Sequence, residues 1–98
     1  MKFGIEFSAR ARDNFKGLRK RNQQVIVDAI QDHLAHEPGK PTRNRKLLED
    51  NPLAPWELRV GGFRVFYDID VDAATVVIVA VGRKLHNRLF IGSEEIEL

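Results

Sequence analysis

Apolar and polar residues alternate at the start of the chain and again through much of its second half. Residues 2–7 alternate with a period of two, which is typical of a strand. Residues 56–60 and 63–69 alternate in the same way and are joined by Gly61-Gly62, a two-residue hairpin signal. The pattern predicts an N-terminal strand and a later β-hairpin.

Between these segments the apolar residues recur at helical spacing. Ser8 is a suitable N-cap for a helix from Ala9 to about Lys20, and a break is expected near Arg21-Asn22. A second helix follows and ends at the Glu37-Pro38-Gly39 turn. Its apolar stripe consists of Val25, Ile26, Ala29, Ile30, His33 and Leu34. So short a link predicts an antiparallel helical hairpin.

The remaining segments extend the sheet. Residues 40–46 are expected to form a basic loop, and the uniformly apolar residues 75–81 a central strand that Gly82 ends. Residues 83–88 are expected to be a basic loop, residues 89–91 a short edge strand and residues 93–98 an acidic tail. The sequence therefore predicts one α+β domain, residues 1–98, with the strand and helical hairpin packed on a twisted antiparallel sheet.

Composition narrows the class of protein. The chain is 43% hydrophobic and 31% charged, as in globular domains, and it contains no cysteine for a disulfide or a thiolate nucleophile. No stretch resembles a signal peptide or a membrane span. We expect a cytoplasmic protein that makes no membrane contact.

Charge is distributed unevenly along the chain. Residues 1–46 carry 11 Lys/Arg against 5 Asp/Glu, whereas residues 47–98 carry 5 against 9. Such asymmetry is compatible with a polyanion-binding patch, and equally with ordinary solvated helix surfaces.

Two arginines stand out in the predicted hairpin. The two-residue turn places Arg59 opposite Arg64, on the sheet face away from the helices. Like charges in that position are unfavourable, so either water and Glu57 relieve the repulsion or an anion binds between them. Arginine suits phosphate because its planar fork donates two parallel hydrogen bonds.

Further cations and aromatic residues could extend this face toward single-stranded nucleic acid. Arg83, Lys84 and Arg88 follow the central strand, while Phe66 and Phe90 could stack on bases. His86 lies inside the same basic segment, where it could transfer protons or simply be a solvated loop residue.

The remaining acidic and histidine motifs do not predict a metal site. Asp68-x-Asp70-x-Asp72 lacks the glycine and the glutamate of a calcium loop and is expected to form a hairpin turn. His33 and His36 lack partners for a metal site. No glycine-rich phosphate loop follows a strand into a helix, so a nucleotide cofactor is not expected, and the sequence predicts neither a metal nor another cofactor.

Residues 55–67 (PWELRVGGFRVFY), 79–84 (VAVGRK) and 87–92 (NRLFIG) resemble the RelE/ParE superfamily of toxins from type II toxin–antitoxin systems. The resemblance implies a partly barrel-like sheet on two helices and a cognate antitoxin encoded beside the toxin. It also implies that operator DNA is bound only by the toxin–antitoxin complex.

The resemblance implies two targets. RelE-like members cut mRNA in the ribosomal A site, where the 2′-hydroxyl attacks the adjacent phosphate and leaves a cyclic phosphate. ParE-like members inhibit DNA gyrase. Arg64 matches the arginine that contacts the scissile phosphate. Lys84 replaces a second arginine, and Phe90 replaces a tyrosine that stacks on the base.

The predicted function is therefore inhibition of translation, and growth arrest, by an mRNA endoribonuclease that acts on the ribosome. Glu57 and Pro55 replace lysines of the family, so proton transfer would fall to His86 or Glu57. The predicted catalytic residues are Arg64, Lys84, His86 and Glu57, and the predicted RNA-binding residues are Arg59, Arg64, Arg83, Lys84, Arg88 and Phe90. Two alternatives remain: gyrase inhibition by protein binding, and a degenerate toxin that binds only antitoxin.

Overall fold

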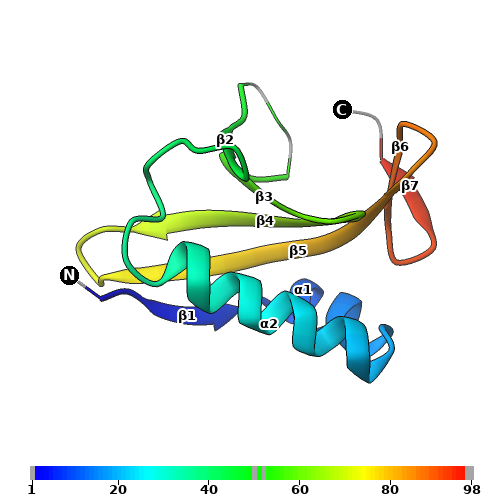
Figure 1. The fold of residues 1–98 in the computed structure, drawn as a ribbon, viewed down its shortest axis with the longest axis horizontal. Helices are drawn as coiled ribbons and strands as arrows, with labels where there is room; N and C mark the ends of the chain where they lie inside the picture. The colour runs from blue at the N-terminus through cyan, green and yellow to red at the C-terminus, as the bar shows by residue number, and fades with distance from the viewer. Residues whose placement is uncertain (1, 50, 52, 97–98) are drawn as a thin grey trace.

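The computed structural model describes residues 2–49, 51 and 53–96. In chain order the elements are β1 (Gly4–Phe7), α1 (Ala9–Lys16), α2 (Lys20–Leu34), β2 (Arg45–Leu47), β3 (Trp56–Val60), β4 (Phe63–Asp70), β5 (Thr75–Leu85), β6 (Arg88–Ile91) and β7 (Glu94–Ile96). Both helices cover one face of the sheet (Figure 1). The fold is α+β, as the sequence predicts.

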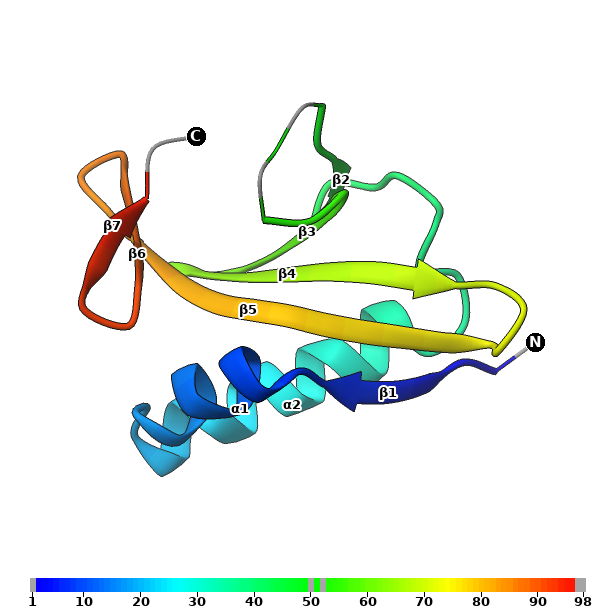
Figure 2. The same cartoon turned by 180° about the vertical axis from the view of Figure 1, so that it is seen from behind.

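The sheet is open and is organised around β5. Its strand order is β2-β3-β4-β5-β6-β7, each antiparallel to its neighbour, and β1 pairs with β5 in parallel. Along the edge of β5 that faces away from β4, β1 pairs with residues 75–78 and β6 with residues 83–85. The 11-residue strand thus connects two halves of the molecule (Figure 2).

Helix α1 fills the gap between β1 and β6 along β5. The Ser8 hydroxyl caps α1 by accepting from the Ala11 N–H at 3.1 Å, and it donates to the Val79 carbonyl at 2.8 Å. Asn14 Oδ1 accepts from the Val81 N–H at 3.1 Å. Side chains of α1 therefore replace ladder partners where β5 has no neighbouring strand.

The break between the helices lies earlier than predicted. Helix α1 ends at Lys16 with Gly17 as its C-cap, and α2 begins at Lys20, so the predicted break near Arg21-Asn22 is wrong. Glycine weakens a helix, and the Gln23 amide donates to the Phe15 and Leu18 carbonyls at the end of α1. The chain reverses there, which gives the predicted antiparallel hairpin (Figure 2).

The main core lies between the helices and the sheet. Ile26, Ile30 and Leu34 of α2 are buried as the stripe predicts, although Val25 is 48% exposed. They belong to one cluster with Leu58, Val65, Tyr67, Val76 and Ile78. The Tyr67 hydroxyl donates to the Pro38 carbonyl at 2.8 Å, and burial raises the pKa of Tyr67.

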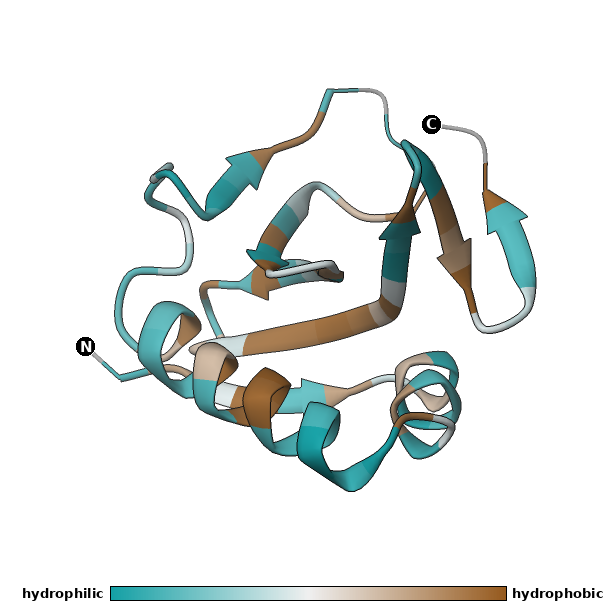
Figure 3. Cartoon of the chain, turned by 45° about the vertical axis from the view of Figure 1, so that its right-hand side comes forward, coloured by the Kyte–Doolittle hydropathy of each residue, from teal (hydrophilic) through white to brown (hydrophobic). Residues whose placement is uncertain are grey.

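A second, smaller core covers the opposite face of the sheet. Phe66 is fully buried there, so it is a core residue and is not available to stack on a base. It packs with Ala54, Ala80, Leu89 and Ile91. The apolar residues of β5 thus face two cores, as predicted for a central strand, and β6 passes over the second face (Figure 3).

The C-terminal third also differs from the prediction. β5 continues through Gly82 to Leu85, and the expected basic loop is only the turn His86-Asn87, whose φ angles are 49° and 67°. Two positive φ angles are typical of a tight hairpin turn. Residues 94–96 of the predicted acidic tail form β7, while Glu97 and Leu98 lie outside the described residues.

Gly82 allows β6 to pack closely against β5. A Cβ at this position would lie 2.7 Å from the Phe90 carbonyl oxygen, closer than real contacts permit. The C-terminal end of β5 turns away from the rest of the strand, and β6 runs beside that end (Figure 3). The glycine that was predicted to end the strand therefore permits close strand packing.

Candidate functional site

The arginine pair lies where the hairpin register predicts it. Arg59 is directly opposite Arg64, and Gly82 of β5 completes the same row. Two residues further along the ladder, Glu57 pairs with Phe66, and Lys46 of β2 pairs with Glu57. Directly paired residues share a face, so these side chains lie on the side away from the helices.

Arg64 is buried, although the hairpin register places it on the sheet face away from the helices. It is 8% exposed, and its Nη1 donates to the Gly61 and Phe63 carbonyls, each at 2.8 Å. The guanidinium therefore holds the turn of its own hairpin. The second core covers part of this face, and the Arg64 side chain is buried beside it, so Arg64→Ala is expected to affect folding as well as activity.

Glu57 forms an ion pair with Arg64. Arg64 Nε lies 3.2 Å from Glu57 Oε1, and the two side chains are 10% and 15% exposed. The Nε–H is not aimed at the oxygen well enough for a hydrogen bond, so the contact is electrostatic. Burial lowers the pKa of Arg64, while Glu57 opposes that shift and Arg59 adds to it.

Exposed cations surround this pair. Arg59 and Lys46 are exposed on the same face, and Lys84, two residues beyond Gly82, joins them. We call the set Lys46, Glu57, Arg59, Arg64 and Lys84 the Arg64 face. Lys46 was missed from sequence because its segment was expected to be a loop and not a strand.

Arg83 and Phe90 lie on the other side of the sheet. Arg83 pairs with Phe63 on one side and with Phe90 on the other, and its guanidinium carbon lies 5.2 Å from the centre of the Phe63 ring. Phe63 packs against the main core, so this row belongs to the helix side. The six predicted RNA-binding residues are therefore not brought together on one face.

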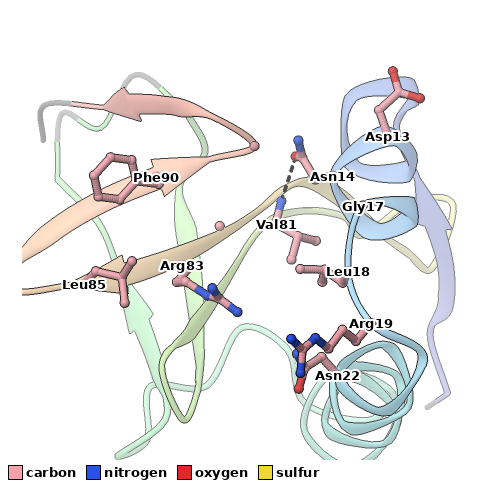
Figure 4. Close-up of a pocket in the computed structure, with 12 residues that line it drawn as sticks. Asp13, Asn14, Gly17, Leu18, Arg19, Asn22, Val81, Arg83, Leu85 and Phe90 are labelled. Carbon is pink, nitrogen blue, oxygen red and sulfur yellow. Dashed lines mark hydrogen bonds between the residues drawn. The ribbon is translucent and has the colours of Figure 1, made fainter.

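A groove opens on the helix side between the two helices and the β5–β6 hairpin. Its volume is about 1020 Å³, and Arg19 and Arg83 extend toward each other across it (Figure 4). We call it the helix-side groove; it is lined by Asp13, Asn14, Gly17, Leu18, Arg19, Asn22, Val81, Gly82, Arg83, Leu85, Phe90 and Gly92. Arg19 and Asn22 were missed because only tertiary packing brings them to β5.

Residues 5–87 match the family described as ParE toxin of type II toxin–antitoxin system, parDE. The chain belongs to this family. The toxin also resembles a chain in the crystal structure of the toxin–antitoxin complex RelBE2 from Mycobacterium tuberculosis, with 27% identity and a TM-score of 0.71. That match covers 86% of this chain and 100% of the other. No curated protein matches the toxin.

The other predicted site residues of the toxin lie near the hairpin tips. His86 is exposed in the β5–β6 turn, and exposed Arg88 lies 3.9 Å from Glu95, as an ion pair. Among the described residues no group of three His, Asp or Glu could hold a metal. Asp70 accepts from the Ala73 N–H, as expected for a hairpin turn.

No helix in the described part of the toxin is long and apolar enough to cross a membrane.

Proposed function

We propose that this toxin inhibits translation by cutting mRNA on the ribosome, and that a cognate antitoxin neutralises it. The observation that supports this function is the Glu57–Arg64 pair, a carboxylate 3.2 Å from a fixed guanidinium on a face with three exposed cations. A base beside a phosphate-binding group is what attack by a 2′-hydroxyl on a phosphate requires.

In this proposal Glu57 accepts the proton of the 2′-hydroxyl as the 2′-oxygen forms its bond to phosphorus. The bond from phosphorus to the 5′-oxygen breaks, and a cyclic phosphate is left. Arg64 stabilises the charge that builds on the phosphate oxygens, helped by Arg59 and Lys84. His86 lies in the β5–β6 turn, six residues along the chain from the point where the Glu57 row meets β5, so the departing 5′-oxygen takes its proton from water and not from His86.

The need for a ribosome follows from the small number of exposed cations. Lys46, Arg59 and Lys84 give few contacts with phosphates. Nonspecific RNA affinity grows with the number of phosphates neutralised. A weak RNA site of this kind works efficiently when the ribosome holds the mRNA strand in place.

Primer extension on cellular mRNA after induction tests the proposal. Wild-type toxin should create new 5′ ends, and Glu57→Gln should reduce them by about 10²-fold or more, the usual contribution of general base catalysis. Glu6→Gln controls for the loss of an exposed carboxylate, and the urea midpoint of Glu57→Gln shows whether the unpaired Arg64 has destabilised the fold. Growth arrest without new mRNA ends would disprove the endonuclease function.

Gyrase inhibition is the second candidate, and the position of Phe90 favours it. The residue that stands in for a stacking tyrosine lacks the hydroxyl and lies across the sheet from Arg64. A purified toxin that blocks DNA supercoiling by gyrase at micromolar concentration, without cutting mRNA, would support this alternative. Normal growth on expression of the wild-type toxin would point instead to a degenerate toxin that only binds antitoxin.

A further inference from the structure

A separate cavity of about 560 Å³ lies at the end of the molecule that carries the β4–β5 turn, away from the β5–β6 hairpin (Figure 1). The loop after α2 forms one side of it, and the start of β3, the end of β4 and the residue before β1 form the other. We call it the end cavity. It shares no residue with the Arg64 face or with the helix-side groove, so the function proposed above does not account for it.

Fixed contacts hold the walls of the end cavity in place. The Tyr67 hydroxyl donates to the Pro38 carbonyl at 2.8 Å, and the Phe3 N–H donates to the Ala35 carbonyl at 2.6 Å. These bonds tie the end of α2 and the loop after it to β4 and to the start of β1. The Trp56 ring stacks on the Tyr67 ring, with centroids 5.9 Å apart and an interplanar angle of 19°. A cavity with fixed walls loses little conformational entropy when it binds a ligand.

The end cavity exposes apolar and aromatic surface to solvent. Phe3, Ile69 and Trp56 are only partly buried against the main core, and Trp56 is the only tryptophan of the chain. Val71 beside them is 67% exposed. Methylene groups of a ligand are stabilised when they leave water for such a surface, and the face of a tryptophan ring attracts an ammonium group.

Two carboxylates from different elements line the same cavity. Asp68 is exposed near the end of β4, accepts from the neighbouring Ile69 N–H at 2.8 Å, and forms no ion pair with another described residue. Glu37 lies in the loop after α2, where Lys40 pairs with it at 3.6 Å. The Lys40 and Glu37 side chains are 67% and 63% exposed. Exposed pairs of this kind contribute little free energy, so a ligand cation can displace Lys40.

We propose that the end cavity binds an aliphatic diamine or polyamine, a chain of methylene groups that ends in ammonium groups. Asp68 and Glu37 bind the ammonium groups, and Trp56 and Ile69 pack against the methylene chain. A metal ion fits less well, because it needs more oxygen ligands than two carboxylates offer. The proposal does not depend on which target the toxin attacks.

The location of the cavity predicts what the ligand does. A bound diamine connects the loop after α2 to β4 and binds only the folded chain, so it should raise the melting temperature. It leaves the Arg64 face open, so activity of the toxin should continue with the ligand bound. Activity assays of the toxin and binding assays of this cavity therefore give independent results.

Fluorescence of Trp56 reports binding at this place, because the chain has no other tryptophan. Titration of the full-length toxin with 1,4-diaminobutane or spermidine should give a saturating change in emission. Magnesium chloride at equal ionic strength should leave the emission unchanged, since it supplies only screening. A change that does not saturate, or an equal change with magnesium chloride, would overturn the proposal.

Asp68→Asn is the main variant. The asparagine oxygen can still accept from the Ile69 N–H, so the fold should be kept while the negative charge is lost. Isothermal titration calorimetry with spermidine should show an affinity about tenfold lower than that of wild type. Lys40→Ala should act in the opposite direction and raise the affinity about threefold, because it removes the cation that competes for Glu37. Wild-type affinity in both variants would contradict the proposed contacts.

Asp32→Asn is the matched control. Asp32 is an exposed carboxylate of α2 and does not line the end cavity. The same loss of charge there should change spermidine affinity by less than about twofold, as expected for a charge outside the contact. An equal loss in Asp32→Asn and Asp68→Asn would mean diffuse attraction to the protein surface and would overturn the proposal.

Butylamine tests whether both carboxylates take part. It has the methylene chain of 1,4-diaminobutane but only one ammonium group, so it should bind about tenfold more weakly. Equal affinity for the two amines would show a site for a single ammonium group, such as a lysine side chain of another protein. That result would overturn the assignment to a diamine or polyamine.

Discussion

The two faces of the sheet use arginine in opposite ways. On the Arg64 face the guanidinium is 8% exposed and is held by Glu57 and two backbone carbonyls. In the helix-side groove Arg19 and Arg83 are exposed, and Arg83 rests on an aromatic ring. A buried charge is fixed in place and costly to remove, whereas an exposed charge can be exchanged at little cost to folding. Stability should therefore respond differently to substitutions on the two faces.

Arg64→Ala should give the largest change in stability. The substitution removes the hydrogen bonds to Gly61 and Phe63 and leaves Glu57 buried without its partner. Breaking a buried pair in this way should lower the free energy of unfolding by about 3 kcal/mol. Urea denaturation followed by circular dichroism measures the loss.

A double variant separates the pair from its surroundings. Replacing both charges, with Glu57→Leu and Arg64→Met, should recover much of the stability, because no unpaired charge then remains. If Arg64→Ala alone unfolds at the wild-type urea midpoint, the Arg64 face does not depend on this contact.

Gly82→Ala should give the next largest loss of stability, because Gly82 is where β6 packs closest against β5. The added Cβ would lie 2.7 Å from the Phe90 backbone oxygen, which cannot rotate away. β6 should therefore shift and loosen the packing of Leu89 and Ile91 in the second core, which should lower the free energy of unfolding by about 2 kcal/mol. Thermal unfolding measures the cost, and Gly62→Ala is the control because its nearest neighbour lies 4.0 Å away.

Asn14→Ala should cause a smaller loss of stability, because it removes a single hydrogen bond between α1 and β5. It leaves the Val81 N–H without its acceptor, in a part-buried site. The expected loss is about 1 kcal/mol, the net value of one hydrogen bond. Amide hydrogen exchange should show faster exchange at Val81. Unchanged exchange there would mean that water or a rearranged α1 satisfies the amide.

The sequence predicts the register of the β3–β4 hairpin and much of the main core, because a period of two or 3.6 residues is a local property. The Arg59–Arg64 pairing follows directly from the Gly61-Gly62 turn. The burial of Phe66 and Arg64 could not be predicted in this way. It depends on where β6 and the segment before β3 pass over the sheet, and those are long-range contacts.

The continuation of β5 past Gly82 shows the same limit. A glycine after an apolar run ordinarily marks the end of a strand, yet here it permits the close approach of β6. Alternation does continue through residues 83–85, and it would have placed Arg83 and Lys84 on opposite faces. That pattern was the available signal that the basic segment does not form one binding surface.

Arg59→Ala should give the smallest change in stability and the clearest view of the Arg64 face. Arg59 is exposed and opposes a like charge, so its removal should change the unfolding free energy by no more than about 0.5 kcal/mol. Cleavage of mRNA should nevertheless fall about tenfold, through loss of one charge-assisted contact with phosphate. Arg10→Ala, an exposed arginine on α1, should change neither quantity. Because folding stays intact, unchanged cleavage in Arg59→Ala would mean that RNA does not pass over this face.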